Sequence, residues 1–165
     1  MASKTPQDTD AARRRRRATT AIKESLRELS IQLSLLNHQV GAQVDINDID
    51  LYCLDLINRL GPFSPSALAR RTGLHPATMT GILDRLQRGG WIVRRRDTDG
   101  TDRRAVAVHA VRDRTPDLFR LYSGMNSSVD QICATHTDAE LQLLAGFLRR
   151  ATQAGEKATD DLANG

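Results

Sequence analysis

Arginine is the residue type with the clearest chemical potential in this chain, and it is concentrated in the middle. Residues 59–114 contain twelve arginines and five aspartates, a formal charge of +7 in a chain of +4 overall, so the remainder carries −3. A genome rich in G and C favours arginine everywhere, but it does not remove acids from one segment. Because guanidinium groups bind phosphate oxygens in bidentate fashion, the asymmetry predicts a polyanionic partner.

Other kinds of site chemistry have no pattern here. The sequence contains no Ser-His-Asp spacing, paired-carboxylate signal, glycine-rich phosphate loop or cysteine-histidine cluster, so we expect no enzyme, no cofactor and no metal site. The histidines are dispersed, at His38, His75, His109 and His136. Cys53 and Cys133 lie far apart, which favours two small buried apolar residues. The alternative, oxidant sensing by a cysteine, requires an exposed thiol with a lowered pKa.

Hydropathy argues against a membrane protein. Hydrophobic residues make up 39% of the chain, and no run approaches the roughly 18 to 20 apolar residues of a membrane-spanning helix. The first residues are polar and then arginine-rich, with no apolar segment after the charges, so no secretory signal is expected. We therefore expect a cytoplasmic protein with no membrane partner.

Two short helices separated by a tight turn are predicted after residue 63. Ser64 caps the first helix, Pro65 occupies its first turn, and Thr72-Gly73 ends it. The second helix begins near His75-Pro76 and closes at Gly89-Gly90. Its inward stripe consists of Met79, Ile82 or Leu83, and Leu86. In a helix-turn-helix, the second helix lies in the major groove with its first residues on base edges.

A basic β-hairpin is predicted next. Residues 91–93 form a short apolar run, and valines alternate with alanines over 105–108. The polar segment 97–103 between them contains an Asp-Gly turn. Arginine at a hairpin tip can enter a narrow minor groove, and Arg103 and Arg104 are the candidates.

The order of short helix, turn, helix and hairpin predicts a surface for duplex DNA. Small and hydroxyl side chains at the start of the second helix allow close approach and bonds to bases, while arginines favour phosphates. The candidate DNA-binding residues are Ser64, Ser66, His75, Pro76, Ala77, Thr78, Thr80, Gly81, Arg85, Arg88, Arg94, Arg95, Arg96, Arg103 and Arg104. Asp102 is expected to pair with an arginine and brace the wing.

Over Ser66 to Val108 the chain resembles the MarR family of winged helix-turn-helix regulators. The matching features are Leu68-Ala69, Asp84-Arg85-Leu86 with Gly90, the strand Trp91 to Val93, the pair Asp102 and Arg104, and the valines Val106 and Val108. The chain departs from the family pattern at residues 109–112, where a Leu-Thr and a Gly are common. The resemblance implies a mainly α fold with a small β-hairpin wing, in which the winged helix-turn-helix is flanked by N- and C-terminal dimerisation helices.

The resemblance also implies partners. Such proteins are usually homodimers that bind palindromic duplex DNA, and Arg104 would be the wing-tip arginine. Many bind a small phenolic or lipophilic effector between the dimer helices and the DNA-binding domain, and then release DNA. Many repress their own or a neighbouring gene, so we expect a repressor of this kind.

Heptad-spaced apolar residues occur on both sides of this unit. Each seam alone fits either core packing or a dimer interface, but seams at both ends of a short chain favour a dimer. Dimerisation also has a geometric reason, since two copies one DNA turn apart double the base information. The candidate dimerisation residues are Ile22, Leu26, Leu29, Leu33, Leu118, Tyr122, Leu141, Leu144 and Leu148.

The predicted organisation therefore has five parts. These are a disordered basic N-terminal arm over 1–17, an N-terminal dimerisation helix over 18–45, a winged helix-turn-helix over 46–112, C-terminal dimerisation helices over 113–157 and a frayed tail over 158–165. The run Arg13 to Arg17 in the arm is either a solvated segment or an extra contact to phosphates or a minor groove.

The sequence leaves one alternative to a DNA-binding protein, which is a winged-helix module that dimerises or binds protein and does not read DNA. Acids on the outer face of the helix after Pro76 would favour it, and Asp84 is the one acid there.

Overall fold

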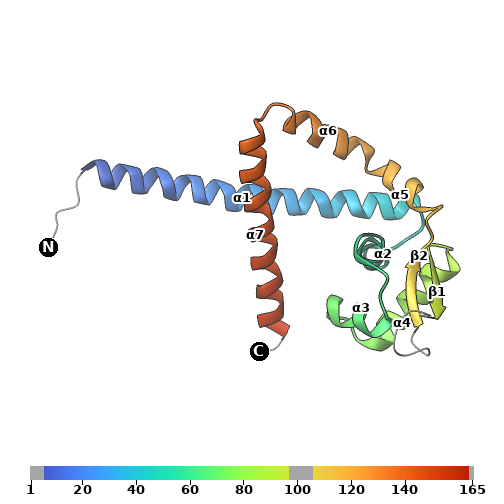
Figure 1. Ribbon diagram of the computed structural model, residues 1–165. Coiled ribbons are helices and arrows are strands. Elements are labelled where there is room, and N and C mark those ends of the chain that lie inside the picture. Colours follow the sequence, from blue (N-terminus) through green and yellow to red (C-terminus); the bar gives the residue numbers. More distant parts are fainter. Residues whose placement is uncertain (1–5, 97–105, 164–165) are drawn as a thin grey trace. The chain divides into compact units, whose positions relative to one another are not determined.

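The computed structural model confirms a mainly helical chain with one small β-hairpin (Figure 1). It describes residues 6–96 and 106–163. The elements are α1 (Pro6–Gln43), α2 (Asp48–Leu60), α3 (Pro65–Thr72), α4 (Pro76–Arg88), β1 (Ile92–Arg96), β2 (Val106–Ala110), α5 (Thr115–Leu121), α6 (Ser123–Cys133) and α7 (Asp138–Ala163). The chain divides into two compact units, Met1–Asp48 and Ile49–Gly165.

Helix α1 begins at Pro6, so the prediction of a disordered arm over 1–17 is wrong for its described residues. The polar composition suggested coil, but it contains no glycine or later proline that would break a helix. Pro6 suits the first helical position, and Asp10 forms an ion pair with Arg14 one turn on. Further along, Ile22, Leu29 and Leu33 of the predicted seam are exposed, by 44, 41 and 38%, and Leu26 is half-buried.

The core of the second unit is built from α2, α3, α4 and the hairpin, which lie together in Figure 1. Helix α2 ends at Leu60, directly before Gly61-Pro62, two residues that oppose continuation of a helix. The largest side chains with under 2% exposure are Leu54, Leu68, Met79, Ile82, Leu83, Leu86, Ile92 and Val108. Both Ile82 and Leu83 face inward, which widens the predicted apolar stripe of α4.

The turn between α3 and α4 has the predicted local chemistry. Ser64 Oγ accepts a hydrogen bond from Ala67 N at 3.2 Å, which confirms Ser64 as the cap. Gly73 adopts a left-handed conformation at φ 67°, and Leu74 N donates to Ala69 O at 3.1 Å. This closure directs the chain into α4, and a side chain at Gly73 would be strained at that φ.

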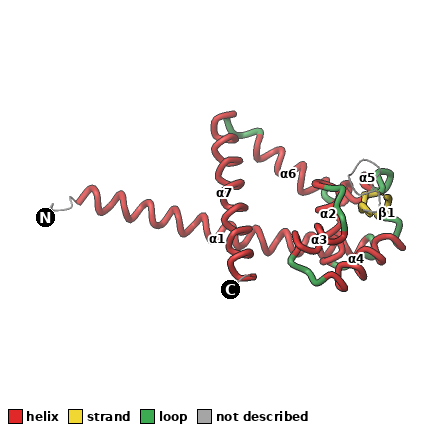
Figure 2. Tube along the Cα trace, turned by 60° about the horizontal axis from the view of Figure 1, so that its bottom comes forward, coloured by secondary structure: helices red, strands yellow, loops and turns green. Residues whose placement is uncertain are grey.

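The hairpin pairs β1 with β2 in antiparallel register, from Ile92 opposite Ala110 to Arg96 opposite Val106. Figure 2 shows strand confined to this part of the chain. A third segment joins it, because Phe63 and Val108 exchange backbone hydrogen bonds at 3.3 and 2.8 Å. The loop before α3 is thereby attached to the wing, a link that the sequence did not suggest.

The C-terminal helices differ from the prediction in two places. The pattern from Leu118 through Tyr122 is divided, since α5 ends at Leu121 and α6 begins at Ser123. Helix α7 reaches Ala163, so residues 158–163 are helical where a frayed tail was expected. At its start, Thr137 and Glu140 form a capping box, with Thr137 N donating to Glu140 Oε2 at 2.8 Å and Glu140 N donating to Thr137 Oγ1 at 3.4 Å.

Four of the five candidate dimerisation residues in this region retain access to solvent. Leu144 and Leu148 are 43 and 49% exposed, whereas Leu118 is buried at 5%. Tyr122 and Leu141 are half-buried. None of the described helices has an apolar stretch long enough to cross a lipid bilayer.

Candidate nucleic-acid interface

The first turns of α4 present small side chains on an open surface. His75 caps the helix, and its Nδ1 accepts a hydrogen bond from Ala77 N at 3.3 Å; the sequence predicted the start of the helix here. Pro76, Ala77 and Thr78 are exposed, and Gly81 is half-buried. These residues lie on the side of α4 away from the buried stripe, so the helix can approach a groove closely at this end.

Hydroxyl groups near this end differ in their bonding. Thr80 Oγ1 donates to Pro76 O at 3.0 Å, which leaves only its lone pairs for a ligand. The exposed Thr78 has no hydrogen-bond partner for its hydroxyl among the described residues. Ser64 Oγ is engaged as a cap and lies 3.2 Å from Ser66 Oγ, while Ser66 itself is exposed. Thr78 and Ser66 are therefore the hydroxyls best placed to meet DNA.

Arg85 has a partner that the sequence analysis missed. Its Nε and Nη2 donate to the two carboxylate oxygens of Asp50 on α2, each at 2.7 Å. The Asp50 side chain is only 4% exposed, and that of Arg85 is 45% exposed. The hydrogen bond to Asp50 raises the pKa of the Arg85 guanidinium above its ordinary value. The donors that would grip a phosphate in bidentate fashion are thus used to fix α4 on α2.

A sequence signal for this pair existed. Asp50 stands on the same helical stripe as Leu54 and Ile57, which are buried at 1 and 3% exposure. A carboxylate on an apolar stripe requires a hydrogen-bonded cation. The identity of that cation could not be read locally, because Arg85 lies 35 residues further along the chain.

Arg94 connects strand β1 of the hairpin to helix α4. Its Nη2 donates to Asp84 Oδ1 at 2.7 Å, so one strand arginine is held against α4. Arg88 Nε donates to Asp84 O at 3.4 Å, while Arg95 and Arg96 are exposed. The brace predicted for Asp102 therefore has a described counterpart in Asp84. Asp102, Arg103 and Arg104 themselves lie outside the described residues.

Arg114 fixes the turn from α4 into β1. Its guanidinium lies 4.1 Å from the centroid of the Trp91 ring, and its Nη1 donates to Gly89 O at 2.5 Å. A Cβ on Gly89 would stand 2.8 Å from Trp91 Cδ1, so this close approach requires glycine. Sequence reasoning counted Arg114 among the basic residues and did not find this role.

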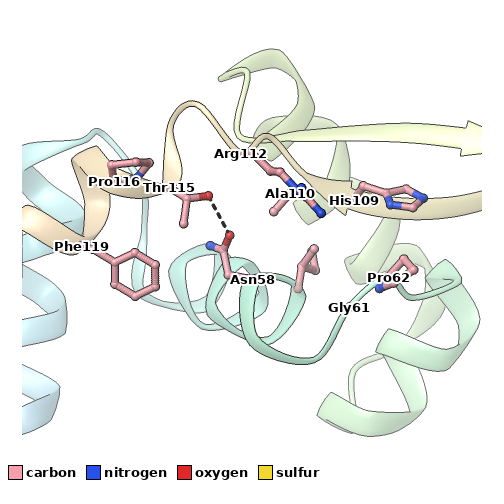
Figure 3. A pocket seen from close by; sticks show the side chains of 10 residues that line it. Asn58, Gly61, Pro62, His109, Ala110, Arg112, Thr115, Pro116 and Phe119 are labelled. Carbon is pink, nitrogen blue, oxygen red and sulfur yellow. Dashed lines mark hydrogen bonds between the residues drawn. The ribbon is translucent and has the colours of Figure 1, made fainter.

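A cavity of about 360 Å³ lies between the end of α2 and the junction of β2 with α5. Asn58 and Thr115 both line it, and Thr115 Oγ1 donates to Asn58 Oδ1 at 3.1 Å, the hydrogen bond drawn in Figure 3. Its lining includes the cationic Arg112, the imidazole of His109 and the half-exposed ring of Phe119. His109 and Arg112 belong to residues 109–112, where the sequence departs from the pattern of the MarR family.

The two cysteines have different surroundings. Cys53 is fully buried, and desolvation, with the nearby Asp50 charge, raises the pKa of its thiol to about 11. At neutral pH this thiol stays protonated, so Cys53 is a packing residue and not a reactive one. Cys133 is half-buried on α6.

Two helices across a tight turn, followed by an antiparallel hairpin tied to the second helix, define a winged helix-turn-helix. Comparison with known proteins gives the same result. The family model for the MarR family matches residues 46–106. The uncharacterized HTH-type transcriptional regulator YcgE of Bacillus subtilis is 28% identical over 130 residues, which cover 78% of this chain and 83% of the relative. The HTH-type transcriptional repressor YetL of the same organism is 29% identical over 85 residues, 52% of this chain and 50% of the relative.

Solved structures share the fold. A MarR family protein from Bacillus stearothermophilus aligns with a TM-score of 0.64 at 17% identity and covers 84% of this chain and 96% of its own. Streptococcus pneumoniae FabT, solved in complex with DNA, also has a TM-score of 0.64 at 20% identity, with 85 and 99% covered. The chain is therefore similar to the MarR family over residues 46–106, and it shares the winged helix-turn-helix fold of the solved MarR proteins.

The Asp50–Arg85 pair predicts an asymmetric effect on stability. Arg85→Ala leaves a buried carboxylate without its cation and should lower the free energy of unfolding by about 3 kcal/mol. Asp50→Ala leaves an arginine that water can reach and should cost about 1 to 2 kcal/mol. Urea unfolding followed by circular dichroism measures both. Equal losses, or a larger loss for Asp50→Ala, would show that the cost does not come mainly from a buried carboxylate that has lost its cation.

Proposed function

We propose that this protein is a homodimeric, cytoplasmic repressor that binds a palindromic operator in duplex DNA and acts on its own or neighbouring genes. The observation that carries the proposal is the open, small-residue face at the start of α4, on a helix fixed to its surroundings through Asp84 and Arg85. The direction of regulation is supported by the relative named as a repressor, YetL.

Recognition in this proposal divides between groove and backbone. Ala77, Thr78 and Gly81 enter the major groove, where the hydroxyl of Thr78 bonds a base edge and the methyl of Ala77 can touch a thymine. Ser66, Arg88 and the strand arginines Arg95 and Arg96 contact phosphates, which fix the register without reading sequence. Arg85 acts indirectly, by holding α4 at the angle that the groove requires.

The wing supplies the second contact. Arg103 and Arg104 are proposed to reach the minor groove, whose narrow stretches concentrate negative potential. The competing hypothesis, a module that binds only protein, would predict acids on the recognition face. Asp84 is the one acid in α4, and it is paired with Arg94, so this helix presents no free carboxylate.

Arginine substitution tests the wing. After an operator has been selected from random duplex DNA, Arg104→Ala should weaken operator binding about tenfold, since one base or groove contact contributes about 1 to 3 kcal/mol. Fluorescence anisotropy measures the affinity, and sedimentation should give an unchanged assembly. Arg120→Ala, which removes the same charge on α5, is the matched control. An affinity equal to that of the parent would remove Arg104 from the interface, and no retardation of any duplex at low salt would favour the protein-binding module.

Dimerisation is proposed through the outer helices. Exposed leucines recur at heptad spacing in α1, at Leu29 and Leu33, and in α7, at Leu144 and Leu148. Such stripes are costly in water and are normally covered by another helix. A two-fold axis would then place two copies of α4 about 34 to 36 Å apart, one turn of DNA.

Charge insertion tests the seam. Leu144→Asp combined with Leu148→Asp should convert a particle of two 18.3-kDa chains into a single chain in sedimentation equilibrium, because each carboxylate would be desolvated at the interface. Operator affinity should fall with it. Gln142→Asp with Gln153→Asp adds the same charge to exposed positions of α7 and should leave the dimer intact. A double variant of the leucines that remains dimeric contradicts this interface.

The cavity at the end of α2 is proposed as the effector site. Its volume lies within the range of small-molecule pockets. Arg112 and His109 would bind an anionic group, and Phe119 would pack against an aromatic ring. A ligand there separates Asn58 from Thr115 and so pushes on the end of β2, which moves the wing relative to α4.

Ligand response can be measured with benzoate as the probe. Millimolar benzoate should raise the operator Kd of the parent severalfold. Arg112→Gln should bind the operator without responding, because the carboxylate loses its cation. Arg120→Gln should respond as the parent does. An equal response in Arg112→Gln places the effector elsewhere, and an unresponsive parent rules out aromatic carboxylates as the class.

A further inference from the structure

The five arginines Arg13 to Arg17 lie within α1 and are all exposed. Successive residues of an α-helix are separated by about 100°, so five in a row encircle the helix. They form a cationic collar, defined here as Arg13–Arg17, in place of the loose basic arm that the sequence suggested. Neither the winged helix-turn-helix nor the heptad seams use this collar.

The collar opposes the stability of its own helix. Arginines three and four positions apart on one helix repel each other, as Arg13 does Arg16 and Arg17. Within the part of the chain that the structure describes, Arg14 is the member that forms an ion pair, with Asp10. Four adjacent guanidinium groups therefore present their donors to solvent, and a polyanion would relieve their repulsion.

The surroundings of the collar decide which polyanion fits. A membrane-surface helix needs a bulky apolar face beside its basic residues. Here the flanking residues are small or polar, Ala11 and Ala12 before the collar and Ala18, Thr19 and Thr20 after it, and the first large apolar residue is Ile22. A lipid surface would gain little buried area. Duplex DNA instead offers about one phosphate per 1.7 Å of axis, a density that suits a ring of cations.

We propose that the Arg13–Arg17 collar is a second DNA contact, which binds backbone phosphates of duplex flanking the operator. This inference rests on the proposed function for its choice of duplex DNA. The collar reads no bases, since a ring of arginines around a helix has no single face to insert into a groove. It raises affinity for all duplexes alike and leaves the preference for the operator to α4 and the wing.

The test compares two variants of the full-length protein that lose four charges each. The first is R13Q/R15Q/R16Q/R17Q, which removes the unpaired part of the collar. The matched control is R27Q/R149Q/R150Q/K157Q, which removes four exposed cations elsewhere. Operator affinity is measured from about 50 to 200 mM KCl, on a duplex ending at the operator and on one extended by about 20 base pairs on each side.

On the extended duplex, the first variant should lose more than tenfold in affinity at low salt. The slope of log Kd against log salt should decrease by about 3 for each chain that engages DNA, at about 0.9 per phosphate released. The ratio of operator to random-duplex affinity should be unchanged, and the control should keep the slope of the parent. Circular dichroism should report undiminished helicity in the first variant, because repulsion has been removed.

Two outcomes overturn the inference. One is a salt slope equal to that of the parent on both duplexes. The other is an unchanged slope together with lost binding to vesicles containing phosphatidylserine, which would assign the collar to lipid. Failure of the proposed function would give a different result. The parent would then bind duplexes with no preferred sequence, while the collar variant could still show the reduced salt slope.

Discussion

Asp50 carries a negative charge on the buried face of α2. Arg85 on α4 pairs with this carboxylate and donates two hydrogen bonds of 2.7 Å to it. The carboxylate and the guanidinium are both planar and pair in bidentate fashion. The pair therefore restricts rotation of α4 about its own axis as well as the distance between α4 and α2. A bidentate ion pair depends on the mutual orientation of its two planar groups, which non-directional apolar contacts do not. The direction in which Ala77 and Thr78 point therefore depends on a contact about two turns away.

The arginines of the basic segment have separate roles, which their clustering in the sequence conceals. Arg85 and Arg94 bind carboxylates, and Arg114 packs on Trp91, so all three stabilise the arrangement of α2, α4 and the hairpin. Arg88, Arg95 and Arg96 keep their guanidinium groups at the surface. A charge total thus overstates the number of cations that can release counterions on DNA binding, and the salt slope of the winged domain alone should be smaller than its net charge implies.

Local chemistry was predictable and non-local chemistry was not. The bounds of α4 and the caps at Ser64, His75 and Thr137 follow from residues within one turn of each other, and the structure agrees. The partner of Arg85 and the bridge from Phe63 to Val108 join distant segments, for which a single sequence holds no distance information. The start of α1 was mistaken because helix formation there needs no apolar face, only the absence of breakers.

The ion pairs of α4 are formed in its second half, by Asp84 and Arg85, while the residues proposed to read bases occupy its first half. In the proposed function, substitutions at the exposed positions 77 and 78 would change the preferred operator without touching these ion pairs, whereas a side chain at Gly81 would meet the Arg85 guanidinium at 3.5 Å. Such a separation makes the recognition face free to diverge. Related regulators could acquire new target genes by a few changes on one turn, with folding stability left almost untouched, and an engineered specificity library would do best to vary positions 77 and 78 and to keep Gly81.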